Sequence, residues 1–165
     1  MLRRSRPRGG FTLVEAAIVT AIVGIGCVTM LALLAAGTVS NATGTELTTA
    51  INLAQSIREM SLGLSFADPT TPTHWGVESG ETSVALYDDL DDLDGRTFSP
   101  PIDARRLPLA NSDTWAQRVT VKSVDPNRLT LDVPNGSTPT SRVTVIVSHR
   151  GHDVYQTSWL AVEPD

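Results

Sequence analysis

The side chains best suited to chemistry in this 165-residue chain are carboxylates, and five of them crowd into one short stretch. The segment "YDDLDDLDGRTFSPP", residues 87–101, contains Asp88, Asp89, Asp91, Asp92 and Asp94. Carboxylate oxygens are hard ligands that suit calcium. The EF-hand spacing is absent, because with Gly95 in sixth place the first and twelfth positions would be Leu90 and Pro101. Three interpretations therefore stay open: a calcium site, a solvated acidic loop, or an acidic surface for a partner protein.

Other groups that could carry chemistry are sparse. His149, His152 and Asp153 flank the expected turn Arg150-Gly151, but no further metal ligand is evident beside them. Several serines lie near histidine or aspartate in the sequence, yet no nucleophile motif such as G-x-S-x-G occurs. We therefore expect no catalytic residues and no enzyme activity.

One more carboxylate, Glu15, stands alone in an apolar run. No other residue from Phe11 to Thr45 carries a charge. A charge in hydrocarbon is costly, so an ionisable residue at such a place points to a functional site. Either the run stays outside a membrane, or Glu15 has a partner within it.

The apolar run is long enough to cross a bilayer. Residues 11–39 form 29 positions, whereas a bilayer core needs about 20 apolar residues in a helix. Four arginines precede the run, so the positive-inside rule places the N-terminus in the cytoplasm and the C-terminal body across the membrane. An ordinary cleaved secretory signal has a shorter apolar core, of about 7 to 15 residues.

The charges are divided unevenly along the chain. The first eight residues hold four of the 13 basic residues, so nine basic residues stand against 18 acidic ones in the rest. Phosphate attraction requires a basic face. An acidic body of this kind argues against nucleic-acid binding.

The N-terminal features resemble the class III signal of type IV pilins and type II secretion pseudopilins. The residues that carry the resemblance are Gly9-Gly10-Phe11-Thr12-Leu13-Val14-Glu15, behind a short basic leader and ahead of a long apolar stretch. Gly10 matches the residue before the cut, Phe11 the residue after it, and Glu15 the fifth mature residue. The resemblance covers residues 1 to about 60. We interpret the chain as a minor pilin or pseudopilin.

The resemblance implies a processing and assembly pathway. A prepilin peptidase would cleave after Gly10 and N-methylate Phe11. The partners it implies are this peptidase, other pilin or pseudopilin subunits, an inner-membrane assembly platform and the lipid bilayer. The subunit would be a single-pass inner-membrane protein with a periplasmic C-terminal domain, and would assemble into a periplasmic or extracellular filament. Whether that filament is a secretion pseudopilus or a type IV pilus stays open.

Within that family, Glu15 is expected to neutralise the terminal amine of a neighbouring subunit. An intrachain contact to its own amine or to Thr12 is the alternative. The family implies no obligatory cofactor, although some pseudopilins bind calcium in periplasmic loops, which favours calcium at the acidic stretch. The rival function from another class is a signal-anchored periplasmic enzyme or binding protein, and the mature N-terminus distinguishes the two.

The elements that position these residues follow from hydrophobic spacing. Leu47, Ile51, Ala54 and Ile57 recur at three- and four-residue steps, and this pattern extends the apolar run into one helix from about residue 12 to 62. Alternating segments predict strands at 118–124, 128–133, 141–149 and 154–162, paired in sequence as two hairpins. Shorter strands are expected near 74–78 and 83–87.

These elements predict an α+β fold. The first half of the long helix would cross the membrane, and its second half would pack on a C-terminal antiparallel sheet of about four strands. The organisation we expect is a leader at 1–10, a transmembrane or filament-core helix at 11–39, and an amphipathic continuation at 40–63. A loop-rich connector at 64–117 and the sheet region at 118–165 follow.

Overall fold

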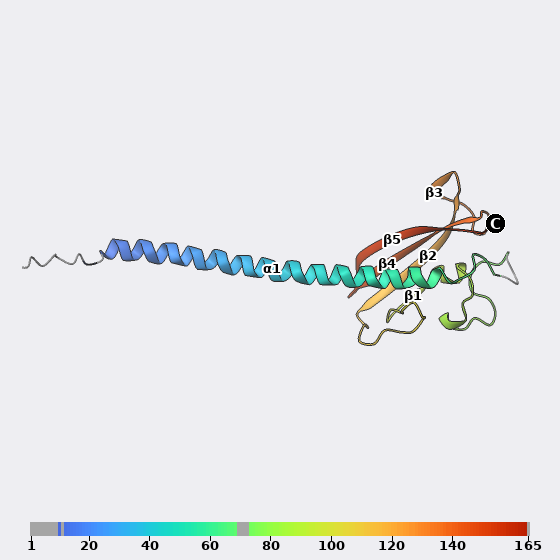
Figure 1. The fold of residues 1–165 in the computed structure, drawn as a ribbon, viewed down its shortest axis with the longest axis horizontal. Coiled ribbons are helices and arrows are strands. Elements are labelled where there is room, and N and C mark those ends of the chain that lie inside the picture. The colour runs from blue at the N-terminus through green and yellow to red at the C-terminus, as the bar shows by residue number, and fades with distance from the viewer. Residues whose placement is uncertain (1–9, 11, 69–72, 165) are drawn as a thin grey trace, which may run out of the picture. The chain divides into compact units, whose positions relative to one another are not determined.

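A single 49-residue helix, α1 (Leu13–Ser61), begins the fold in the computed structural model, which describes residues 10, 12–68 and 73–164 (Figure 1). The Thr12 Oγ1 accepts a hydrogen bond from the Glu15 N–H at 3.2 Å, which caps the first turn. The helix ends where the Gly63 N–H bonds to the Met60 carbonyl at 3.1 Å. The predicted helix over 12–62 is confirmed, and its length is roughly 75 Å.

Contacts divide the chain into two compact units, residues 1–44 and 45–165, which are described separately here. All described residues of the first unit are exposed. Its large apolar side chains include Leu13, which is 89% exposed, and Leu33, which is 74% exposed. By length and composition α1 can span a membrane.

The second unit contains an antiparallel sheet of five strands (Figure 1). Its strands are β1 (Thr97–Phe98), β2 (Trp115–Asp125), β3 (Arg128–Asp132), β4 (Thr140–His149) and β5 (His152–Val162). The order is β1-β2-β4-β5, with β3 paired to β2 outside this path. The long ladder between β2 and β4 runs from Trp115 opposite His149 to Ser123 opposite Ser141.

The core of the second unit lies between the end of α1 and one face of the sheet. Apolar residues of α1, of the connector and of β2 and β4 form one buried cluster: Ala50, Leu53, Ala54, Ile57, Met60, Tyr87, Leu90, Leu93, Ile102, Val119, Val121, Val143, Val145 and Val147. The alternating valines of β2 and β4 share one face because side chains alternate along a strand. This arrangement confirms the predicted α+β fold with the helix packed on a C-terminal antiparallel sheet.

Both predicted hairpins are present, but the first is shorter than expected. β4 and β5 form the second hairpin, with Arg150 and Gly151 both at positive φ in its tight turn. β3, however, pairs with β2 only near their turn, and all five of its residues are exposed. The first hairpin is therefore short and involves only the C-terminal end of β2. Most of β2 pairs with β4.

The reason lies along the second edge of β2. Backbone groups of alternate residues point to the same edge of a strand. On the edge of β2 that faces away from β4, these groups already bond to the connector. The Val119 N–H donates to the Arg96 carbonyl at 2.8 Å, and the Val121 N–H donates to Asp94 Oδ1 at 3.0 Å. The connector therefore occupies the edge that a longer β3 would need.

The expected short strands near 74–78 and 83–87 are wrong. Residues 74–78 form a loop, and the second segment contains the 3₁₀ turn η1 (Val84–Leu86). Another 3₁₀ turn, η2 (Asp91–Leu93), follows, and the connector supplies its only assigned strand among the described residues as β1. The sheet thus begins earlier than residue 118, because β2 itself starts at Trp115.

Candidate functional site

The acidic stretch of the connector is held against the core and is not the solvated loop that was one interpretation of it. Asp89 and Asp92 are wholly buried, and Asp91 is 3% exposed. Leu90 and Leu93 are the cause, since both belong to the buried apolar cluster. Asp89 precedes the 3₁₀ turn and forms an isolated bridge with Ser65, while Asp92 lies within the turn, and both are buried beside the two leucines.

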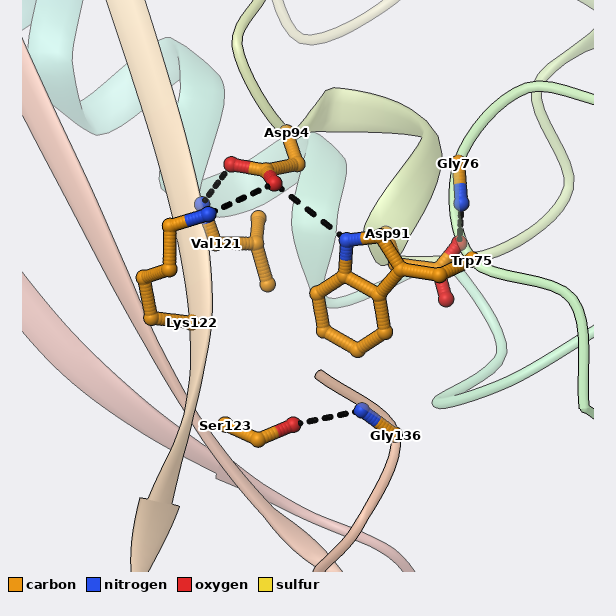
Figure 2. A network of polar contacts seen from close by, with 8 residues as sticks. All are labelled: Trp75, Gly76, Asp91, Asp94, Val121, Lys122, Ser123 and Gly136. Atoms are coloured by element: carbon orange, nitrogen blue, oxygen red, sulfur yellow. Dashed lines mark hydrogen bonds and ion pairs between the residues drawn. The ribbon is translucent and has the colours of Figure 1, made fainter. Parts of the chain in front are cut away.

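Backbone N–H groups fix the orientation of these buried carboxylates. Asp89 Oδ1 accepts hydrogen bonds from the N–H groups of Asp91 at 3.0 Å and Asp92 at 3.2 Å. Asp92 Oδ2 accepts from Asp88 at 3.1 Å and Asp89 at 3.3 Å. Asp91 Oδ1 accepts from the Gly76 N–H at 2.9 Å (Figure 2). Each carboxylate therefore has one oxygen anchored by the backbone.

Two further carboxylates, Glu78 and Glu81, join this group from an earlier part of the connector. One carboxylate oxygen each from Glu78, Glu81 and Asp92 lie within 4.8 Å of one another, and the same holds for Asp89, Asp91 and Asp92. The Glu78 N–H donates to Glu81 Oε2 at 2.9 Å. We call these five residues the acidic cluster. Sequence reasoning missed the two glutamates, because nothing local shows that residues 78–81 fold back onto residues 89–92.

Several buried oxygens of the acidic cluster have no hydrogen-bond donor. They are both carboxylate oxygens of Glu78, Oδ2 of Asp89 and Oδ1 of Asp92. Within the described ranges, none of the five residues forms an ion pair with Lys, Arg or His. Arg96 lies nearby, but its Nε donates to the backbone carbonyl of Asp92 at 3.2 Å. The acidic cluster is therefore a concentration of negative charge without a matching cation among these residues.

The proton affinities of these carboxyl groups reflect that crowding. Burial raises the pKa of Asp89 to about 7, and the nearby Asp91 carboxylate adds to the rise. Burial also raises the pKa of Asp92 to about 7. The pKa of Glu78 is raised by burial and then by Glu81, while burial pushes the pKa of Glu81 upward but hydrogen bonds led by the Glu78 N–H lower it overall.

Asp94 does not join the acidic cluster, although the sequence grouped it there. Its Oδ2 accepts hydrogen bonds from Trp75 Nε1 at 3.2 Å and from Lys122 Nζ at 3.0 Å, and its Oδ1 accepts from Val121 (Figure 2). The backbone of Asp94 is extended and ends the 3₁₀ turn, which directs the side chain to β2. Asp94 is a fully engaged structural residue.

Asp88, the remaining predicted ligand, has an exposed side chain at the margin of the acidic cluster. One of its carboxylate oxygens lies within 4.8 Å of oxygens of Asp68 and Asp89. Its backbone N–H, by contrast, helps to anchor Asp92. The structure thus brings together Asp89, Asp91 and Asp92 of the five predicted aspartates, with Asp88 beside them.

Of the two histidines near the β4–β5 turn, His149 packs against its neighbours and His152 is exposed. The rings of Trp115 and His149 stack with their centroids 4.2 Å apart. His149 Nδ1 lies 2.6 Å from Glu46 Oε1 on α1. These contacts hold the tip of the hairpin against the first turns of α1 in the second unit.

The residues of the predicted processing site lie at the start of α1. Gly10 and Thr12 are exposed, and Phe11 lies outside the described residues. Glu15 sits in the first helical turn, where its backbone N–H is capped by Thr12. Among the residues that the structure describes, no ion pair involves the Glu15 carboxylate. Its predicted partner, the amine of another subunit, stays a prediction.

Comparisons with protein-family models, with curated proteins and with solved structures return no match for this chain.

Proposed function

We propose that this chain is a structural subunit, a minor pilin or pseudopilin, of a type II secretion or type IV pilus-like filament. In this proposal the chain is cleaved after Gly10 and N-methylated on Phe11. The observation that carries it is the combination of Gly10-Phe11 with a lone acidic residue, Glu15, in the first turn of a long apolar helix. The resemblance of residues 9–15 to the class III signal assigns a role to each of these positions.

The first unit supports a role in a membrane and then in a filament. Its large apolar side chains are exposed along the N-terminal part of α1, from Leu13 to Val39. Isolated soluble proteins rarely expose continuous apolar surface of this extent. A bilayer would cover this surface before assembly, and the helices of neighbouring subunits would cover it in the filament.

The chemistry of cleavage explains why a carboxylate is useful at Glu15. Cleavage after Gly10 creates an α-amino group on Phe11, with an ordinary pKa of about 8, and methylation leaves it protonatable. A buried carboxylate alone costs several kcal/mol, and pairing with a cation removes much of that cost. Glu15 also lies at the positive end of the helix dipole. A free subunit would thus carry an unfavourable charge that a neighbour's amine neutralises.

The second unit would be the part displayed on the filament surface. Its own core encloses the last turns of α1, with Ala50, Ile57 and Met60 buried. This leaves the N-terminal helix available for contacts with other subunits. The proposal therefore assigns assembly to the first unit and the displayed surface of the filament to the second.

The proposal is tested first at the mature N-terminus. Co-expression with a prepilin peptidase should yield a chain that begins with N-methyl-phenylalanine at residue 11, measured by intact-mass and peptide mass spectrometry. An unprocessed chain, or one cut at a different site, would contradict the proposal and favour the signal-anchored enzyme or binding protein.

Assembly is tested by Glu15→Ala, with Glu59→Ala as the matched control on an exposed position of the same helix. Glu15→Ala makes the segment more apolar, so membrane insertion should persist. Removing one partner of a buried charge pair costs roughly 3 to 5 kcal/mol, so incorporation into filaments should be lost. Equal co-purification of the Glu15→Ala chain with filaments would refute the pairing of Glu15 with a neighbour's amine.

A further inference from the structure

The acidic cluster has no role in the proposed filament function, and its geometry points to a ligand. We propose that Glu78, Glu81 and Asp92 bind one calcium ion. Their carboxylate oxygens converge within 4.8 Å from two separate parts of the connector. This convergence is a property of the folded chain, since Glu78 and Glu81 lie outside the aspartate-rich segment that the sequence indicates.

Several buried carboxylate oxygens of the site have no hydrogen-bond donor. Asp92 is wholly buried, and its Oδ2 is held by two backbone N–H groups while its Oδ1 has no donor. Both oxygens of Glu78 are likewise buried without a partner. An ionised carboxylate can only accept, so ionised neighbours cannot satisfy one another, and without a cation only a shared proton can join them. A bound cation would satisfy these oxygens and neutralise the crowded charge.

The ligand chemistry favours calcium. The three groups are all hard oxygen donors, and no cysteine or histidine belongs to this group, which disfavours the softer transition metals. Calcium accepts about 6 to 8 oxygens in irregular geometry, whereas magnesium requires a near-octahedral site and usually takes only one or two carboxylates. Three converging carboxylates on an irregular loop therefore suit calcium better.

A surface hollow lies beside the site on the Glu78 side. An open surface hollow lined by Thr73, His74, Glu78 and Ser79 borders the acidic cluster. A hydrated ion could enter there and retain water ligands on that side. Asp89, which is buried beside Asp92, would add negative charge in the immediate surroundings.

The bound ion would fasten the connector to the core. Asp92 belongs to the turn whose Leu93 is buried in the apolar cluster, while Glu78 and Glu81 are half-buried in an earlier part of the connector. A calcium ion between them would link these two parts through carboxylate bonds. Calcium binding should therefore stabilise the second unit by mass action on the folded state.

The test uses the full chain in detergent, freed of metal with EDTA. Calcium chloride is titrated by calorimetry, and thermal unfolding is followed by tryptophan fluorescence with and without millimolar calcium. Glu78→Gln is the decisive variant, because the Glu78 carboxylate accepts no hydrogen bond from a backbone N–H or a basic side chain that the substitution would break. Asp113→Asn, at an exposed position outside the acidic cluster, is the charge-matched control.

We expect calcium to bind and raise the melting temperature of the unsubstituted chain and of Asp113→Asn. Glu78→Gln should bind at least roughly tenfold more weakly, because even outer-shell substitutions weaken metal binding by that factor. In EDTA the Glu78→Gln chain should melt at the same temperature as the unsubstituted chain or higher. Magnesium should produce a smaller shift than calcium.

Several results would overturn the proposal. They are no heat and no melting shift with millimolar calcium, unchanged binding by Glu78→Gln, or a binding loss in Asp113→Asn as large as in Glu78→Gln. A lower melting temperature of Glu78→Gln in EDTA would show a structural role for the glutamate and also refute the site. A magnesium shift equal to that of calcium would refute the assignment of the ion. None of these outcomes bears on cleavage after Gly10, so the two proposals fail separately.

Discussion

Two buried polar sites in the second unit differ in how their hydrogen-bonding groups find partners. Gln117 on β2 is wholly buried, yet both ends of its side chain have partners. Its Oε1 accepts from the Ile102 N–H at 2.8 Å, and its Nε2 donates to the carbonyls of Leu53 at 2.8 Å and Ile102 at 3.1 Å. One neutral side chain thus links α1, the connector and the sheet.

The acidic cluster shows the opposite outcome of burial. When ionised, its carboxylates are acceptors only, and the backbone donors nearby satisfy some of their oxygens while leaving others without a donor. An amide carries its own donor and acceptor and can be completed by the chain itself, but a group of buried carboxylates requires protons or a cation from outside. The buried polar side chain of Gln117 therefore stabilises the fold. The buried carboxylates of the acidic cluster instead fit the proposed calcium ion.

The largest effect should come from Gln117→Leu. The substitution leaves the buried N–H and carbonyl of Ile102 without their partner, and each unsatisfied group costs about 1 to 3 kcal/mol. We expect a loss of about 3 kcal/mol or more in the free energy of unfolding, measured by denaturant titration of the full chain in detergent.

The matched control for this prediction is Gln156→Leu, at an exposed position of β5. It should change stability by less than about 0.5 kcal/mol. The loss from Gln117→Leu should be the same with and without calcium. A calcium-dependent loss would show that the two polar sites do not act separately.

A smaller loss is expected from Asp94→Ala, which removes an aspartate that is fully engaged outside the acidic cluster. Trp75 Nε1 and the Val121 N–H would lose their acceptor, and Lys122 its partner. We expect about 2 kcal/mol of lost stability in the same denaturant titration.

Asp94→Asn keeps an oxygen for the Val121 N–H and should lose about half as much. Neither substitution should alter calcium binding in the calorimetric titration. If Asp94→Asn abolished binding, the division between Asp94 and the acidic cluster would be wrong.

The smallest expected effect is a gain in the free energy of unfolding, from Asp92→Asn. Without metal, Asp92→Asn retains an oxygen for the two backbone N–H groups and removes one unpaired charge. We expect the free energy of unfolding in EDTA to rise by about 1 kcal/mol. With calcium present the substitution should instead reduce the melting temperature relative to the unsubstituted chain. A loss of stability in both conditions would contradict the unpaired-charge interpretation.

The same charges predict how the metal-free chain responds to pH. The pKa values of Asp89 and Asp92 are raised to about 7, so the folded chain holds protons that the unfolded chain releases near its ordinary value of 3.8. The resulting stability is complete below about pH 4 and is lost as the pH rises through about 7. In EDTA, thermal unfolding should occur at a higher temperature at about pH 5 than at about pH 8.

The regular elements could be predicted because their spacing is local. Apolar residues at helical steps indicated α1, and alternating residues indicated β2 to β5. The short extent of the β2–β3 pairing could not be predicted in the same way, because it depends on Arg96 and Asp94 occupying the edge of β2 from a distant part of the chain. Alternation shows that a segment is a strand, but it does not show which edge remains free.

The candidate site was predictable only in part, for a similar reason. The density of aspartates drew attention to residues 88–94, and Asp89, Asp91 and Asp92 do lie together. Asp94 turns away because the backbone becomes extended there, and Glu78 and Glu81 enter by tertiary folding. A composition-based search finds the charges but cannot tell which of them converge.

The long sequence separation between Gln117 and Leu53 determines how late in synthesis their contact can form. The two residues are 64 positions apart, and the contact between Glu46 and His149 spans 103 positions. The ribosome therefore completes α1 long before it makes the strands that cover the helix. The apolar face from Ala50 to Met60 stays bare until β4 has emerged, because Val143, Val145 and Val147 complete the core. A chain that stops before β4 should lose the fold of the second unit as a whole, and during each round of synthesis this face requires shielding until the last strands arrive.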